Sequence, residues 1–388
     1  MKALCLNKIS KVALDKLEES DKVVDNVSEA DAILVRSANM HEYELPENVL
    51  AVARAGAGYN NIPIDQYADK GVVVFNTPGA NANGVKELVL AGLILASRDV
   101  VGGIEYVKAN TLNPDIAKSV EKEKSKYAGV EVINKKIGIV GLGVIGVLVA
   151  NMCVDLGMEV YGYDPYLSIV NAMHLSKDIK YVKELGDIYR KCDYISLHLP
   201  LNASTEKMFN DEAFKKMKKG VVLLNFARDL LVDDEALKEA IAAGIVKKYV
   251  TDFPNEKNVK LPNTIAIPHL GASTKEAEDN CAMMAIKQIK NYLELGSIKN
   301  SVNYPNCEVG PISSGCRITI NHYNQPGMIN KFTDEIVYHN GNIAHLTNQS
   351  KGNFAYSVID VDGIDGEALV ADISNIPGVL KVRVIKWN

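Results

Sequence analysis

The sequence lacks the patterns by which zinc-binding, secreted and membrane proteins are recognised. Its six cysteines are scattered, with no Cys-x-x-Cys pair and no histidine at zinc-finger spacing, so we expect reduced thiols and no metal site. The apolar stretch at residues 1–6 is too short for a signal peptide. The longest apolar run, residues 88–96, falls well below the roughly 20 residues of a membrane span. We therefore expect a cytoplasmic protein without a membrane partner.

An excess of positive charge is also missing. The chain has 43 Lys and Arg against 48 Asp and Glu, a net charge of −5. Such a chain does not attract a phosphate backbone over long range, so we expect no nucleic-acid partner. The hydrophobic share of 47% and the length of 388 residues are typical of a globular protein with two or three domains.

An α/β pattern fills the first hundred residues, where short apolar strands alternate with helical stretches and with turns rich in glycine, asparagine and proline. Residues 83–108 indicate one long helix that leads into the next domain. A helix from about residue 274 to 295 is long enough to return across the boundary. We therefore expect a discontinuous, flavodoxin-like first domain built from residues 1–97 and 275–300.

Residues 98–274 form the second predicted domain, in which further strands alternate with helices as in a doubly wound parallel sheet. Its first strand is followed by Gly141-x-Gly143-x-x-Gly146 and a helix. In this pattern the glycines allow a tight turn, close approach of a pyrophosphate and close helix packing. Asp164 follows the next strand and would accept hydrogen bonds from the ribose hydroxyls while repelling a 2′-phosphate. The pattern predicts a Rossmann domain that binds NAD.

The last part of the chain begins with a connector rich in proline, glycine and serine, residues 301–316. Residues 317–388 then follow a βαββαβ order. This order predicts a ferredoxin-like sheet of four strands with two helices on one face.

Three polar side chains follow successive strands of the second domain: Arg228, Glu256 and His269. Parallel sheets bind ligands beyond the carboxyl ends of their strands, so the three are expected to meet in one crevice. A nicotinamide site that oxidises an alcohol needs a base for the hydroxyl proton and a cation for the substrate. A histidine beside a carboxylate and an arginine supply these groups.

Four segments together resemble the NAD-dependent D-2-hydroxyacid dehydrogenase family, namely residues 141–146, 225–228, 253–256 and 268–274. The resemblance covers about the first 300 residues. It implies that His269 is the acid and base, Glu256 its partner and Arg228 the clamp for the substrate carboxylate. It also implies a cofactor site made of Gly141, Gly143, Val144, Ile145, Gly146, Asp164, His198, Ala227, Asp252 and Gly271.

The chain departs from this family pattern at several positions. Asp229 stands where the family usually has glycine, and Lys257 where it commonly has proline. Thr251 takes the place of the family's cofactor-contacting aspartate, and Asp252 comes one residue later.

Segments 34–37, 54–62 and 76–88 resemble the phosphoglycerate dehydrogenase branch of the family. Exposed backbone N–H groups near glycines can bind a carboxylate, and arginine or lysine can bind a phosphate. The alternative is that the cations are ordinary surface charges. The implied substrate site consists of Arg36, Ser37, Arg54, Ala57, Gly58 and Lys86.

Residues 320–328 resemble the first strand and turn of an ACT domain. Such a module pairs across a dimer and binds amino acids, so the resemblance implies a homodimer or homotetramer and an L-serine effector contacted by His322, Asn324 and Asn342. The alternative is that residues 326–327 only turn the chain and the polar residues face water.

The sequence thus favours NAD-dependent oxidation of 3-phospho-D-glycerate to 3-phosphohydroxypyruvate, the first step of L-serine biosynthesis, with allosteric regulation by serine. Two alternatives stay open. One is another D-2-hydroxyacid oxidoreductase, such as a hydroxypyruvate or glyoxylate reductase. The other is a non-catalytic regulator that senses NAD.

Overall fold

The computed structural model describes residues 1–312 and 315–386 of the chain. It divides into two compact units. Unit 1 combines Met1–Asn81 with Lys275–Asn388, and unit 2 is Ala82–Thr274. Residues 313–314 of the predicted connector and 387–388 of the predicted third domain lie outside the described residues.

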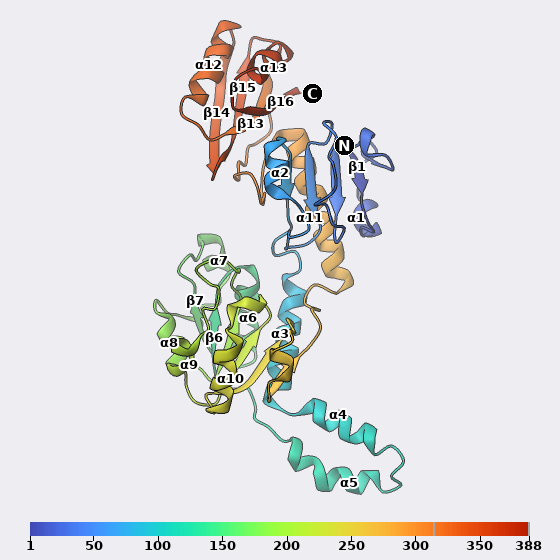
Figure 1. Ribbon diagram of the computed structural model, residues 1–388, viewed down its shortest axis with the longest axis vertical. Coiled ribbons are helices and arrows are strands. Elements are labelled where there is room, and N and C mark those ends of the chain that lie inside the picture. Colours follow the sequence, from blue (N-terminus) through green and yellow to red (C-terminus); the bar gives the residue numbers. More distant parts are fainter. Residues whose placement is uncertain (313–314, 387–388) are drawn as a thin grey trace. The chain divides into compact units, whose positions relative to one another are not determined.

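Unit 1 contains a parallel sheet in the order β2-β1-β3-β4-β5, which is the flavodoxin-like order. This confirms the predicted fold of the first domain. Every residue of the central strand β3 is buried, because helices cover both faces of the sheet (Figure 1). The strands and first helices are β1 (Lys2–Cys5), α1 (Lys11–Leu14), β2 (Lys22–Val24), β3 (Ala32–Val35), β4 (Ala51–Arg54), α2 (Ile64–Asp69) and β5 (Val73–Phe75).

The long helix α11 (Lys275–Leu295) returns to this sheet from the far end of the sequence. It packs small side chains such as Ala282 and Ala285 against Ala51 and Ala53 of β4. Small residues on both sides let the helix approach the sheet closely. Helix α11 therefore makes the first domain discontinuous, because it completes the core of the sheet that residues 1–81 form.

The C-terminal part of unit 1 is an antiparallel sheet in the order β14-β15-β13-β16, with two helices packed on one face. The βαββαβ order is confirmed. On the opposite face, Tyr356 and Val358 enter the same core as α11 and β5, so this module is joined to the first sheet by buried contacts. Its elements are β13 (Cys316–Tyr323), α12 (Met328–Tyr338), β14 (Asn342–Lys351), β15 (Phe354–Asp362), α13 (Gly366–Ser374) and β16 (Val379–Lys386).

Unit 2 is built on seven parallel strands in the order β12-β11-β10-β9-β6-β7-β8. The order in which successive strands are added to the sheet reverses between β6 and β9, which confirms a doubly wound Rossmann sheet. Sheets of this kind bind ligands beyond the carboxyl ends of the strands at that switch point. The strands are β6 (Lys136–Val140), β7 (Glu159–Tyr163), β8 (Lys180–Tyr181), β9 (Tyr194–Leu197), β10 (Val221–Asn225), β11 (Val246–Thr251) and β12 (Thr264–Ala266).

Helices cover both faces of this sheet (Figure 1). On one face α3 packs on α6, with Val85, Val89 and Leu93 in the same core as Val147 and Ala150. On the other, α8, α9 and α10 contribute Ile188, Phe214 and Leu237. The helices of unit 2 are α3 (Ala82–Ser97), α4 (Val100–Ala109), α5 (Ile116–Glu123), α6 (Val144–Asp155), α7 (Ile169–His174), α8 (Leu185–Lys191), α9 (Asp211–Lys215) and α10 (Asp234–Ala242).

The expected single helix over residues 83–108 is wrong, because the chain breaks between α3 and α4. The Asp99 carboxylate accepts a hydrogen bond from the Gly102 N–H and begins a new helix. The compact unit also begins at Ala82, not at the predicted residue 98, since the apolar face of α3 is buried on α6. Within the described residues, no helix is both long and apolar enough to span a membrane.

Candidate active site

The glycine turn between β6 and α6 has the geometry of a dinucleotide site. Gly141 has a φ of +93°, and a Cβ there would lie 2.5 Å from the His198 carbonyl oxygen. A Cβ on Gly146 would lie 1.9 Å from the Gly141 carbonyl oxygen, so only glycine fits at both positions. Gly143 precedes α6, and nothing lies within 4 Å of where its Cβ would be. The open side of Gly143 is where a pyrophosphate can approach the helix N-terminus.

Asp164 holds this turn from the neighbouring strand. Its carboxylate accepts hydrogen bonds from the backbone N–H groups of Leu142 and Tyr166, both at 2.8 Å. A carboxylate has about four lone-pair positions, so acceptor capacity remains for ribose hydroxyls. The structure places this negative charge directly beside the glycine turn.

The remaining predicted cofactor residues lie at the first turn of α6 and at the ends of β9 and β10. Val144 is 50% exposed although it is apolar, which leaves a contact surface beside the turn. His198 shares a hydrogen bond of 2.9 Å with Ser196 Oγ, and burial lowers the pKa of its imidazole to about 3. His198 is therefore a neutral group. Ala227 is buried at the start of the loop that carries Arg228.

The predicted catalytic residues follow the adjacent strands β10, β11 and β12. The side chains of Arg228 and His269 are exposed, and the His269 ring packs against Phe253 with ring centroids 4.6 Å apart. Glu256 is also exposed. Among the described residues Glu256 forms no ion pair with His269, so the two side chains predicted to interact are not in contact through an ion pair in this structure. Hydrogen bonds between catalytic groups are often long in a ligand-free enzyme and shorten when substrate binds.

Asp252 is the carboxylate that the structure places under the electrostatic influence of His269. It is 2% exposed. Burial raises the pKa of Asp252, and electrostatic interactions with His269 and Arg228 and the N–H of Gly271 oppose that shift. Its Oδ1 is buried and has no hydrogen-bond partner among the described residues. An acceptor left without a partner at a strand end fits a ligand that brings a donor, such as a carboxamide.

The departures from the family pattern have a structural explanation in Asn255, a residue that the sequence analysis did not single out. The Asn255 Nδ2 donates to Asp229 Oδ1 at 2.9 Å and to Asp234 Oδ2 at 3.0 Å. Its Oδ1 accepts from the N–H groups of Lys257 and Asn258. Asp229 is thus bound to Asn255, and the loop that carries Glu256 is held at both sides. A single asparagine in a loop has no sequence signal for such a role.

The predicted substrate residues of unit 1 follow β3 and β4. The Arg54 guanidinium lies over the glycine turn at residues 56–58 and donates to the carbonyl oxygens of Arg36 and Gly58 at 3.0 and 2.7 Å. Arg36 forms an ion pair of 2.7 Å with Glu278, and both side chains are 42% exposed. The remaining members are Ser37 and Ala57 in the same loops of unit 1, and Lys86 on α3 of unit 2, whose Nζ donates to Asn83 Oδ1.

The three predicted effector residues do not meet within this chain. His322 is 2% exposed and hydrogen bonds to Ser357 Oγ and Asn348 Oδ1 beneath α12. His322 lies on β13 opposite Ala355 at one end of β15, whereas Asn342 lies opposite Asp362 at the other end of β15. Asn324 is exposed beside the β14–β15 turn. One module therefore cannot bring Asn342 to the same small ligand as His322.

Comparison with known proteins shows what the chain as a whole is similar to. Residues 90–271 match the family model described as the NAD-binding domain of the D-isomer specific 2-hydroxyacid dehydrogenases. The D-3-phosphoglycerate dehydrogenase of Haemophilus influenzae is 31% identical over 95% of this chain and 90% of its own length. The chain belongs to the D-2-hydroxyacid dehydrogenase family. It is an NAD-dependent oxidoreductase, as the sequence predicted.

Three further relatives of this dehydrogenase match a smaller share of the chain. The hydroxypyruvate reductase of Thermotoga maritima is 32% identical over 76% of this chain and 94% of its own length. The crystal structure of NAD+-bound 3-phosphoglycerate dehydrogenase from Entamoeba histolytica has a TM-score of 0.60 and 28% identity, and covers 78% of this chain and 98% of that one. The D-3-phosphoglycerate dehydrogenase of Mycobacterium tuberculosis strain H37Rv is 35% identical, but the chain spans only 53% of it.

The residues of the dehydrogenase fit the NAD that the family binds, on two observations. Gly143 leaves open space at the N-terminus of α6, and Asp252 presents an acceptor without a partner. The individual roles of the site residues stay predictions.

Proposed function

We propose that this dehydrogenase oxidises 3-phospho-D-glycerate to 3-phosphohydroxypyruvate, the first step of L-serine biosynthesis. The observation that carries the proposal is the match to the Haemophilus influenzae D-3-phosphoglycerate dehydrogenase, which extends over 95% of the chain. The match to the hydroxypyruvate reductase extends over 76%. The longer match favours the phosphorylated substrate.

When bound, NAD+ would supply the hydride acceptor for C2 of the substrate. The imidazole of His269 takes the proton of the C2 hydroxyl, so that the C–O bond becomes a carbonyl. Arg228 binds the substrate carboxylate, because its planar guanidinium can donate two parallel hydrogen bonds. Glu256 stabilises the imidazolium of His269 once substrate binding has brought the two side chains together.

Substrate recognition by unit 1 is the second half of the proposal. Its glycine turn offers backbone N–H groups to an anion. Arg36 supplies positive charge that the exposed Glu278 neutralises at present, and an exposed ion pair of this kind exchanges partners at little cost. Arg54 keeps the turn in shape through Gly58. The phosphate of the substrate would therefore replace Glu278 as the ion-pair partner of Arg36.

The test is NADH formation with 3-phosphoglycerate, compared with D-glycerate at equal concentration. We expect kcat/KM to favour the phosphorylated acid, and a preference for D-glycerate would refute the proposed substrate. His269→Asn should lower kcat by roughly 10²- to 10⁴-fold while NAD+ binding, followed by isothermal titration calorimetry, is kept. Undiminished turnover would remove His269 from the mechanism, and loss of NAD+ binding would identify a folding defect.

A hydroxypyruvate reductase is the second candidate, since a relative of that name aligns over 94% of its own length. Under this alternative, NADH oxidation with hydroxypyruvate exceeds that with 3-phosphohydroxypyruvate. Arg36→Met separates the two candidates. It should raise KM for the phosphorylated substrate and leave the rate with hydroxypyruvate unchanged.

Assembly and serine regulation are part of the same proposal. His322 and Asn342 lie at opposite ends of one module, so a serine held by both needs a second copy of the chain. The exposed apolar side chains of the α4–α5 hairpin, which include Ile104, Val107 and Leu112, provide a surface for such a copy. Light scattering should give at least a dimer, and millimolar serine should lower kcat. Asn342→Ala should abolish the serine effect and keep turnover, and a monomer that serine inhibits would contradict the assignment.

A further inference from the structure

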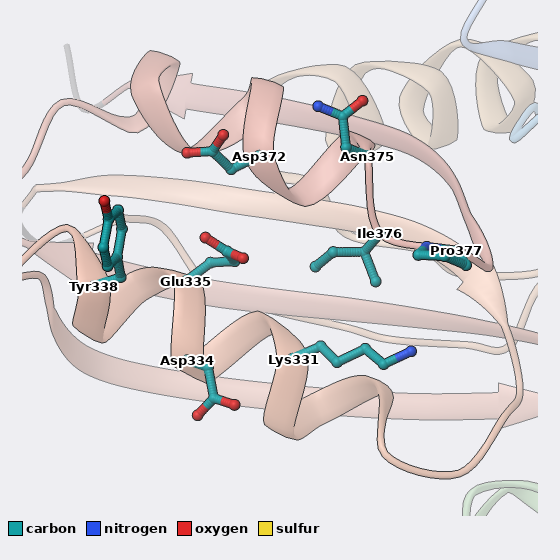
Figure 2. A pocket seen from close by; sticks show the side chains of 8 residues that line it. All are labelled: Lys331, Asp334, Glu335, Tyr338, Asp372, Asn375, Ile376 and Pro377. Carbon is teal, nitrogen blue, oxygen red and sulfur yellow. The ribbon is translucent and has the colours of Figure 1, made fainter.

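A groove separates the two helices on the outer face of the C-terminal module. It is lined from α12 by Lys331, Asp334, Glu335 and Tyr338, and from α13 and the following loop by Asp372, Asn375, Ile376 and Pro377. Figure 2 shows Glu335 and Asp372 on facing sides of this groove. Three carboxylates against one ammonium give the lining an excess of negative charge. None of these residues belongs to the active site or to the predicted effector site.

Three ligand atoms converge at one end of the groove. Glu335 and His339 are four residues apart, and the His339 N–H still donates to the Glu335 carbonyl oxygen, so both side chains lie on the same face of α12. Asp372 comes from α13, and its Oδ2 lies 2.7 Å from His339 Nε2. One ligand atom from each of the three residues lies within 4.8 Å of the others.

The third residue, Glu335, takes no part in the ion pair between His339 and Asp372. Glu335 is half-buried, and among the described residues its carboxylate has no hydrogen-bond or ion-pair partner. It therefore adds a second negative charge beside Asp372. Two carboxylates so close repel each other unless a cation lies between them. The C-terminal end of α12 adds a partial negative charge at His339, which also favours a cation.

We propose that Glu335, His339 and Asp372 bind a divalent transition-metal ion of the zinc class and that the ion clamps α12 to α13. An imidazole with two carboxylates suits zinc, cobalt or nickel better than magnesium, which prefers oxygen ligands. Zinc takes nitrogen and oxygen ligands at about 2.0–2.2 Å in tetrahedral geometry. Ligand atoms around it are then roughly 3.3–3.5 Å apart, so the His339–Asp372 pair opens slightly and Glu335 closes in. The fourth position is left to water.

Zinc titration of the full chain, with any purification tag removed, tests this site. Isothermal titration calorimetry should show one saturable zinc per chain, and cobalt should give the visible absorption of a tetrahedral site. His339→Ala, Asp372→Asn and Glu335→Gln should each weaken zinc binding by about tenfold or more. Zinc should also raise the melting temperature of the parent chain but not that of the variants.

Matched controls come from the same module. Asp334→Asn removes a carboxylate of the groove that is outside the trio, and His345→Ala removes another histidine of the module, so neither should change zinc affinity. Far-UV circular dichroism establishes that each variant is folded. Zinc binding that survives all three substitutions would place the ion on the free thiols and overturn the proposal. Absence of saturable binding, or an effect of Asp334→Asn equal to that of Glu335→Gln, would overturn it as well.

Discussion

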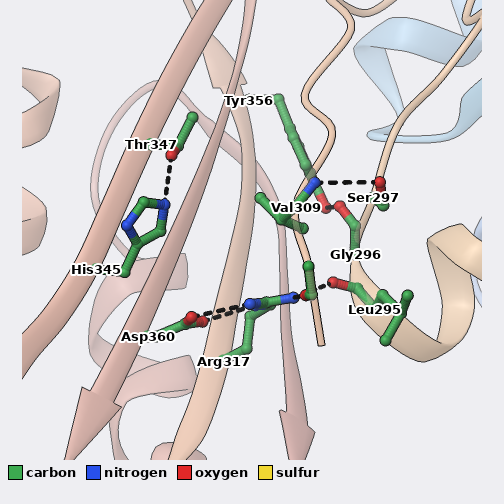
Figure 3. A network of polar contacts seen from close by, with 10 residues as sticks. Leu295, Gly296, Ser297, Val309, Arg317, His345, Thr347, Tyr356 and Asp360 are labelled. Atoms are coloured by element: carbon green, nitrogen blue, oxygen red, sulfur yellow. Dashed lines mark hydrogen bonds and ion pairs between the residues drawn. The ribbon is translucent and has the colours of Figure 1, made fainter. Parts of the chain in front are cut away.

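Replacing Arg317 should detach the C-terminal module from α11. Arg317 is one of the largest fully buried side chains of unit 1, with 2% of its surface exposed. It forms a bidentate ion pair with Asp360, at 2.6 Å from Nε and 2.8 Å from Nη2. Its Nη1 donates to the carbonyl oxygens of Leu295 and Gly310 at 2.7 and 2.8 Å. Figure 3 shows this network between the strands of the module and the end of the helix.

Arg317→Met keeps most of the side-chain volume and removes all four hydrogen bonds. Asp360 then becomes a carboxylate that is only 13% exposed and has lost its partner. Breaking a buried pair in this way costs about 3–5 kcal/mol. For a unit of roughly 200 residues, each kcal/mol lowers the melting temperature by about 2–4 °C. The expected loss is therefore about 6–20 °C in the transition of unit 1.

Differential scanning calorimetry measures this loss, and two further variants make the result specific. The double variant Arg317→Met/Asp360→Leu should regain much of the lost melting temperature, because the Asp360 carboxylate is removed together with its partner. Lys386→Met is the surface control. Lys386 is 57% exposed and pairs with Asp365 and Glu367 at 3.6–3.7 Å, so its loss should cost less than 1 kcal/mol. A shift below 2 °C for Arg317→Met, or a double variant less stable than the single one, would refute the reasoning.

Three further predictions concern other parts of the chain. Gly143→Ala should keep the melting temperature and weaken NAD+ binding in calorimetry, whereas Gly146→Ala should unfold unit 2, because only the second Cβ meets the backbone. Asp252→Asn should lower kcat/KM by roughly 10- to 100-fold if its charge acts on the reaction, since a hydrogen bond to a charged group is worth about 1.5–3 kcal/mol. An unchanged kcat/KM would exclude a role for the Asp252 charge in the reaction. Burial raises the pKa of Asp21, but hydrogen bonds from Lys290 and the N-terminal amino group outweigh burial and lower it overall. Denaturant titrations should therefore find Asp21→Asn destabilising by roughly 1.5–3 kcal/mol at pH 7. The difference should vanish as the pH falls below the ordinary aspartate range and through the lowered pKa, and a pH-independent difference would contradict the assignment.

The glycine turn could be predicted from the sequence because its requirements are local. The positive φ of Gly141 and the contact of Gly146 with Gly141 involve residues only five positions apart, and the flanking strand and helix follow from apolar periodicity. The same applies to the βαββαβ order of the module. A discontinuous first domain was also predictable, because the helix that follows the second domain is long enough to return to the first sheet.

Other features could not be predicted because residues distant in the sequence create them. Nothing near residue 99 marks the end of α3 except one aspartate, and the division of α3 from α4 depends on packing against α6. Arg317 lies in strand β13, where a charge usually faces water, and its burial becomes favourable only through distant partners: Asp360 on β15 and the carbonyl oxygens of Leu295 and Gly310. Asp252 is displaced by one residue from the family position, and its burial depends on the loop that carries His269 and Gly271.

The carboxyl end of α11 is bound by side chains of the C-terminal module. The last carbonyl groups of a helix have no partner within it. Two arginines of the module donate hydrogen bonds to the last carbonyl groups of α11. Arg317 donates to the Leu295 carbonyl oxygen, and Arg383 donates to those of Tyr292 and Leu293. The Arg383 guanidinium also lies 4.7 Å from the centre of the Tyr292 ring. The other end of the same 21-residue helix begins at Lys275, a few residues after His269. The contacts of Arg317 and Arg383 lie within unit 1, so they fix the carboxyl end of this helix to the module.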